Sequence, residues 1–186
     1  DVQPGSKQHA RFALASYGDT YHFKYDFLKD ETRNRWSKTV DGHFDFKNFG
    51  FGVASNGLGL AEQILEVSSV DMNRVIILMT SVVTKDDVNH PNTRYIHDLA
   101  PVVFGIGFPD VNGTNHVAEN KTNMVMIAQN RTEWVFDSID AALASKTGIF
   151  SQIVQAFPCN QIQCSGFIFV VEDTFQTNSS IATFLN

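Results

Sequence analysis

Three stretches of the chain are apolar at almost every position, and one of them lies close to its end. They are RVIILM at 74–79, PVVFGIG at 101–107 and GFIFVV at 166–171. A strand that is apolar on both faces is typical of the interior of a sheet covered by helices on both sides. Burying about five side chains of the last stretch contributes on the order of 10 kcal/mol, which is comparable to the stability of a whole domain. The chain is therefore predicted to end with its most central strand, followed by a turn and the start of a helix.

Two stretches near the start of the chain predict a pair of strands. Residues 11–17, RFALASY, form the first strand, and residues 21–27 form the second. Aromatic and polar side chains alternate along the second strand, so one of its faces is polar. The Gly18-Asp19 turn between the strands predicts an antiparallel hairpin. The polar face predicts that residues 21–27 lie at the edge of the sheet.

Helical patterns fall between the predicted strands. They cover residues 30–40, 58–67, 92–99 and 122–129 and a long helix at 138–157, and a short strand is predicted at 134–136. Strands that alternate with helices indicate a doubly wound α/β fold. We expect a mostly parallel six-stranded sheet with one antiparallel edge strand and helices on both faces. The 186 residues contain no internal repeat and no low-complexity linker, so one domain is predicted.

Charge and hydropathy narrow the classes of partner. The net charge is −6, and the Lys and Arg residues are scattered, which argues against nucleic acid. No apolar run reaches the ~20 residues that span a bilayer. Four Asn-x-Ser/Thr sequons favour a secreted, extracellular glycoprotein. Their asparagines are Asn112, Asn120, Asn130 and Asn178.

The two cysteines, Cys159 and Cys164, lie in the segment PCNQIQC. Their spacing excludes a CxxC redox motif, and their number excludes a zinc site made of four cysteines. In an oxidising compartment a structural disulfide is favoured, and two free thiols are the alternative.

Element order and several local patterns resemble the von Willebrand factor type A (VWA) family. RFALASYGD with YHFKYDF resembles the second strand and edge hairpin of that family, and RVIILMTS resembles the strand that normally ends in a metal-binding aspartate. PVVFGIGFPDVN resembles the next strand, and NMVMIAQNRTEWVFDSIDAAL resembles the helix, strand and helix that close the domain. The resemblance implies a central strand at 166–171, with 11–17 and 74–79 on its two sides.

In the VWA family the central strand comes first, whereas the matching segment here, FIFVVEDTFQTNSSIATFL, comes last. Residues 1–158 therefore resemble a VWA domain without its first strand, and residues 159–186 resemble a linker, that strand and the start of the first helix. One explanation is a circular permutation within the chain. The other, which we favour at this stage, is a unit that completes the next unit of a filament or tandem array. The resemblance also implies that Cys159 and Cys164 bridge, within the chain or to the next unit.

The predicted function is a secreted structural or interaction module that assembles with itself head to tail. The assembly strand consists of Phe167, Ile168, Phe169, Val170 and Val171. The alternative is an extracellular adhesion or ligand-binding VWA domain that binds another extracellular protein, with or without a metal ion.

The family's metal-ion-dependent adhesion site is altered at several positions. The Asp-x-Ser-x-Ser motif aligns with Glu172, Thr174 and Gln176, the loop threonine aligns near Ser55, and the strand-end aspartate aligns with Ser81. Mg²⁺ prefers oxygen ligands that include carboxylates. One aspartate of the site is a longer glutamate here, Glu172, and the other is Ser81, so we expect neither a metal site nor a cofactor. Four aspartates could supply further ligands, although solvated loop side chains are the favoured interpretation. These are Asp86, Asp87, Asp110 and Asp173.

Motifs for catalysis are lacking in the sequence. There is no GxGxxG directly after a strand, no GxxxxGK[ST] loop and no GxSxG elbow. The six histidines are dispersed, and His97, the one nearest a predicted core face, is expected to form a structural hydrogen bond. We therefore do not expect an enzyme.

Overall fold

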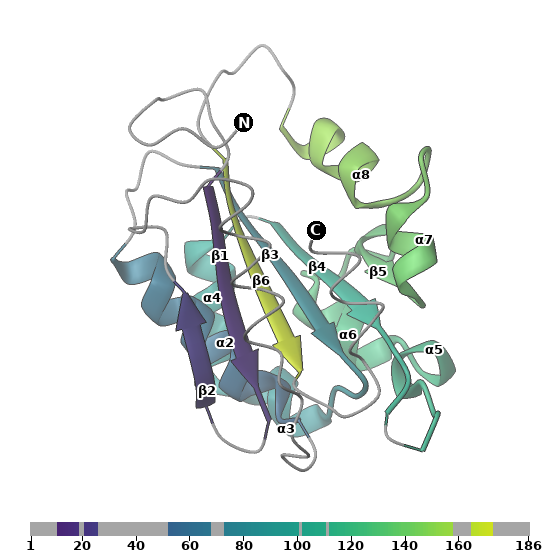
Figure 1. The fold of residues 1–186 in the computed structure, drawn as a ribbon, viewed down its shortest axis with the longest axis horizontal. Coiled ribbons are helices and arrows are strands. Elements are labelled where there is room, and N and C mark those ends of the chain that lie inside the picture. The colour runs from purple at the N-terminus through teal and green to yellow at the C-terminus, as the bar shows by residue number, and fades with distance from the viewer. Residues whose placement is uncertain are drawn as a thin grey trace.

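The computed structural model describes residues 11–18, 21–25, 52–67, 73–100, 102–110, 112–157 and 165–172. Their strands are β1 (Arg11–Tyr17), β2 (Tyr21–Tyr25), β3 (Asn73–Thr80), β4 (Val102–Gly107), β5 (Val135–Phe136) and β6 (Ser165–Glu172). They form one sheet in the order β2-β1-β6-β3-β4-β5 (Figure 1). Five strands run parallel, and β2 pairs antiparallel with β1. An α/β fold with a Rossmann-like parallel sheet is therefore confirmed.

Strand β6 occupies the middle of the sheet, between β1 and β3 of the same chain (Figure 1). Phe169 lies opposite Leu14 on one side and Ile77 on the other. Its neighbours Ile168 and Val170 have no exposed surface. An apolar run fits this place because strands there are covered on both faces. The interior position predicted for residues 166–171 is confirmed.

The connections between the strands are mostly helical. The helices are α2 (Ala54–Glu66), α3 (Lys85–Asn89), α4 (Pro91–Leu99), α5 (His116–Glu119), α6 (Thr122–Ile127), α7 (Ile139–Leu143) and α8 (Ile149–Ala156), with a 3₁₀ turn, η1 (Thr132–Trp134). Figure 1 shows α2 and α4 behind the sheet. Gly57 of α2 packs on Val170, and Gly105 packs on Met124 of α6. The strand register puts Val170 and Gly105 on the same face, so α2 and α6 cover one side of the sheet.

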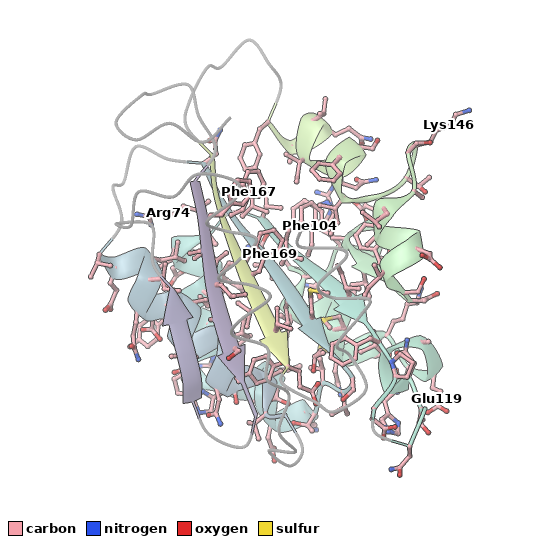
Figure 2. The ribbon with its side chains drawn as sticks, viewed as in Figure 1. Arg74, Phe104, Glu119, Lys146, Phe167 and Phe169 are labelled. Atoms are coloured by element: carbon pink, nitrogen blue, oxygen red, sulfur yellow. The ribbon has the colours of Figure 1, made fainter. Side chains whose placement is uncertain are left out.

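Aromatic side chains line the opposite face of the sheet. The Phe12 ring stacks on Phe167 at 5.5 Å and on Phe169 at 6.1 Å, and Phe104 packs edge-on against Trp134 at 5.6 Å. Figure 2 labels Phe104, Phe167 and Phe169 along the middle of the sheet. Strands β3, β4 and β5 follow one another toward one edge of the sheet, whereas the connection from β5 to β6 runs back across β4 and β3. A right-handed connection therefore carries α7 and α8 to this aromatic face.

The single long helix predicted at 138–157 is wrong, because the structure has two helices, α7 and α8, separated at Gly148. A Cβ at Gly148 would collide with the carbonyl oxygens of Ala142 and Ala144. The chain turns too tightly there for a continuous helix. The intervening residues 144–148 include Ser145, Thr147 and Gly148, which are poor helix formers, so the sequence carries a signal for the break.

Several other boundaries differ from the predicted ones. Helix α2 begins at Ala54 instead of residue 58, because Gly57, which is unfavourable in an isolated helix, is needed where α2 approaches the Tyr17 ring. The short helices α3 and α5 were not predicted. The helix predicted at 30–40 lies outside the described residues, as do residues 26 and 27 of the predicted second strand.

Candidate functional site

The carboxyl ends of β3 and β6 meet beside the segment that leads into α2. Strand β6 ends at Glu172, and Ser81 directly follows β3. In open parallel sheets, ligands bind at the carboxyl edge of the strands. Two positions aligned with the adhesion site, Glu172 and Ser81, therefore come together at the edge where a site is expected.

The carboxyl group of Glu172 is buried, with 1% of the residue exposed. Its Oε1 accepts hydrogen bonds from the Gly52 N–H at 3.1 Å and from the Ser81 hydroxyl at 3.0 Å. Its Oε2 accepts from the Ser81 N–H at 2.6 Å and from the Thr80 hydroxyl at 2.8 Å. The Ser81 hydroxyl also lies 2.9 Å from Oε2, so its one hydrogen is shared between the two oxygens. We call Glu172, Gly52, Thr80 and Ser81 the Glu172 network.

The network offers Glu172 four donors, the number of lone-pair positions of a carboxylate, but the Thr80 hydroxyl also lies 2.8 Å from the Val82 carbonyl oxygen and has one hydrogen to donate. A cation at Glu172 would have to displace protein donors, and Ser81 offers a hydroxyl where the resemblance implies a second carboxylate. The space beside Gly52 is also filled, because a Cβ there would overlap Cγ and Cδ of Glu172. Glu172 is therefore bound by the protein itself.

A second buried carboxyl group, Asp87, lies close to the network. Asp87 is 2% exposed; its Oδ1 accepts from the Ser55 N–H at 2.8 Å, and its Oδ2 accepts from the Thr84 N–H at 2.9 Å and the Thr84 hydroxyl at 2.7 Å. The carbonyl of Ser55 in turn accepts from Asn92 at 3.0 Å. The Ser55 N–H thus donates to Asp87. Among the described residues, no hydrogen bond joins Ser55 to Glu172.

The interpretation of Asp87 as a solvated side chain is wrong, because Asp87 closes a capping box at the start of α3. The spacing Thr84-x-x-Asp87 is a sequence signal that could have identified this role. Asp110 is also buried rather than solvated, at 6% exposed, because its Oδ1 accepts from the N–H groups of Asn112 and Thr114. Asp86 is exposed, as expected.

Tyr17 lies under the Glu172 network without any exposed surface. Its hydroxyl is 3.5 Å from the Met79 carbonyl oxygen. Burial, and secondarily the nearby Glu172, raises the pKa of Tyr17 well above its ordinary value, although a hydrogen bond with Thr80 opposes this. Tyr17 is therefore neutral at physiological pH and separates the polar network from the apolar core.

The remaining predicted positions are dispersed. Three sequon asparagines, Asn112, Asn120 and Asn130, are exposed in turns around α5 and α6. His97 forms the expected structural hydrogen bond, with Nε2 2.8 Å from the Ile127 carbonyl oxygen. Six candidate residues lie outside the described part of the chain: Cys159, Cys164, Asp173, Thr174, Gln176 and Asn178.

Comparison with protein-family models, curated proteins and solved structures finds no match. Within the described residues, no group of three or more His, Cys, Asp and Glu side chains is placed to hold a metal ion. None of the described helices is both long enough and apolar enough to cross a membrane.

Proposed function

We propose that this chain is a VWA-like module for protein interaction that works without a metal ion, secreted and glycosylated rather than enzymatic. The observation that carries the proposal is the contact of the buried Glu172 carboxyl group with four protein donors. In the family that the sequence resembles, a metal ion at this edge joins the loops and contacts the partner. Here the hydrogen bonds of Glu172 link Gly52, just before α2, to Thr80 and Ser81 at the end of β3 without an ion.

Partner binding in this proposal uses the loops beyond the network. Thr84, Lys85 and Asp86 are exposed next to it, and the turn at Asn112 and Gly113 is exposed after β4. These side chains are polar and carry both signs of charge, which suits a protein surface. A partner protein in the extracellular space is thus the proposed ligand, recognised through loops held by a rigid sheet.

Metal titration tests this proposal directly. Thermal unfolding of the full chain is measured with a chelator and then with millimolar Mg²⁺, Mn²⁺ or Ca²⁺. We expect the same midpoint in every case, because a cation at Glu172 would have to displace protein donors from a buried carboxyl group. A stabilisation by one of the ions that the chelator removes would contradict the proposal, since a ligand that binds only the folded state raises stability.

The proposed compartment has its own test. Exposure of Asn112, Asn120 and Asn130 supports glycosylation, because an attached sugar at these turns would point into solvent. Protein purified from its natural source should lose mass on treatment with an N-glycosidase, and Cys159 and Cys164 should resist alkylation until reduced. Unchanged mass together with two reactive thiols would place the protein in a reducing compartment.

Self-assembly through β6 is the second candidate function. The pairing of β6 with β1 and β3 supports a permuted unit that is complete in one chain. Exchange of β6 between copies is nevertheless favoured by its place after the other described strands, from which residues 158–164 separate it in sequence. Two differently tagged full-length chains are mixed either when native or before refolding. Co-purification only after joint refolding supports exchange, and its absence in both cases argues for the closed unit.

A further inference from the structure

The dipeptide Asn-Gly occurs twice in the chain, at Asn56-Gly57 and at Asn112-Gly113. This dipeptide can react with itself, because glycine has no side chain to shield its backbone nitrogen from the side-chain amide of the asparagine. The glycine nitrogen attacks the amide carbon, and ammonia leaves. The reaction needs no enzyme, but it needs a backbone that is free to close the ring. The two dipeptides share this chemistry, so the fold determines which of them reacts.

The first dipeptide, Asn56-Gly57, is held in a conformation that prevents ring closure. Both residues lie in α2, where the fixed backbone dihedrals keep the Gly57 nitrogen from turning toward the Asn56 side chain. Gly57 is also buried, and a Cβ there would lie 2.4 Å from the Tyr17 ring. Ring closure at Asn56 would therefore require α2 to leave the sheet.

The second dipeptide lies in the turn between β4 and α5, where Asn112 and Gly113 are both exposed. Gly113 has a φ of 82°, and no atom lies within 4 Å of the position where its side chain would begin. Its N–H donates to the Asp110 carbonyl oxygen at 3.0 Å, so ring closure must wait until this turn opens. Local opening of an exposed turn costs much less free energy than the unfolding of a packed helix.

We propose that Asn112 is a site of spontaneous modification in the folded protein, where it is converted to aspartate or isoaspartate. The Gly113 nitrogen forms a bond to Cγ of Asn112 while the bond from Cγ to Nδ2 breaks. Nδ2 leaves as ammonia with the proton of the Gly113 N–H, and a cyclic imide remains. Water then opens the imide. Attack at Cγ gives aspartate, and attack at the backbone carbonyl carbon gives isoaspartate.

Conversion of Asn112 would alter the turn that follows β4. Either product adds a carboxylate two residues from Asp110, and isoaspartate also lengthens the main chain by one atom. The hydrogen bonds that the N–H groups of Gly113 and Thr114 donate to Asp110 should then weaken. A glycan would occupy the same Nδ2, so glycosylation and conversion compete for Asn112. The inference concerns the reactivity of this turn and goes beyond the proposed function, on which it does not depend.

Peptide mapping of the full-length, unglycosylated chain tests the proposal. The protein is incubated at mildly alkaline pH, and the fragments that contain Asn56 and Asn112 are followed by chromatography and mass spectrometry. In the folded protein, Asn112 should be converted roughly tenfold faster than Asn56 or more, because only its turn opens locally. In the chain unfolded by urea, the two asparagines should react at similar rates, since both are followed by glycine.

The variant Asp110→Ala gives a second readout. It removes the side-chain acceptor of the Asn112 and Thr114 N–H groups, so conversion of Asn112 should become faster while that of Asn56 keeps its rate. Thermal unfolding checks that the variant folds. The proposal is overturned if Asn112 persists in the folded protein but reacts in urea. It is also overturned if Asn56 reacts as fast as Asn112 in the folded protein, or if a folded Asp110→Ala variant leaves the rate at Asn112 unchanged.

Discussion

Replacement of Glu172 by Gln changes one atom of a buried side chain and keeps its size. If the new amide nitrogen takes the place of Oε1, it faces the Gly52 N–H, and if it takes the place of Oε2, it faces the Ser81 N–H. Hydroxyl groups can rotate and accept a hydrogen bond, but a backbone N–H cannot. Either orientation therefore leaves one buried backbone donor without an acceptor.

The expected loss of stability follows from that donor. A buried unsatisfied donor costs ~1–3 kcal/mol, and the hydrogen bond itself contributes ~0.5–1.5 kcal/mol, so Glu172→Gln should lower the free energy of unfolding by about 2–4 kcal/mol. Water cannot take the place of the lost acceptor without entering a site where Glu172 is 1% exposed. This loss is a large fraction of the stability of a typical domain.

Urea unfolding followed by both fluorescence and circular dichroism measures this change. Glu66→Gln is the control: Glu66 is exposed at the end of α2, and the free energy of unfolding should change by no more than ~0.5 kcal/mol. The free energy of unfolding of Glu172→Gln could instead equal that of the control, with an unchanged slope against urea concentration. The four donors would then not hold the carboxyl group as described. The site would then be open to water or a cation.

Three further changes test other contacts. Gly57→Ala should destabilise the protein by ~1–3 kcal/mol in urea unfolding, despite the better helix propensity of Ala, because its Cβ would overlap the Tyr17 ring; equal or greater stability would show that α2 can move away. Because the pKa of Tyr17 is raised, the folded state keeps the Tyr17 proton to a higher pH than the unfolded state does. The stability that the protonated Tyr17 contributes is therefore lost as pH rises above about 10. Tyr17→Phe should weaken the alkaline fall in the thermal midpoint, whereas Tyr95→Phe should not. Hydrogen bonds from the N–H of Thr114 and then of Asn112, and the nearby His116, lower the pKa of Asp110 against the opposing effect of burial, so the contribution of Asp110 to stability is lost as pH falls below about 4. Acid should therefore lower the protection factor of the Thr114 amide, and Asp110→Asn should remove that acid-induced change; an unchanged effect of acid would refute the assignment.

Prediction from sequence works best where burial dictates the residue type. The run at 166–171 could be placed inside the sheet because a strand covered on both faces needs apolar side chains throughout. The meeting of Glu172 and Ser81 was also predictable, since parallel strands bring their carboxyl ends to one edge. The break before Gly148 was missed, because the apolar spacing over 139–157 favoured one helix and outweighed the poor helix propensity of Gly148.

The donors to Glu172 mark another limit. Two of the four are backbone N–H groups, of Gly52 and Ser81, and every residue except proline has one. A carboxyl group held by such donors leaves little trace in composition or spacing. The burial of Asp87 differs, because Thr84 three residues earlier provides the capping signal.

The central place of β6 also sets an order of events during synthesis. Arg11 pairs with Gly166, so β1 leaves the ribosome long before its parallel neighbour is made. Until then β1 and β3, which flank β6 in the finished sheet, have no strand between them. Such distant pairing slows folding and leaves strand edges open to aggregation. The nascent chain should therefore depend on chaperones until β6 emerges.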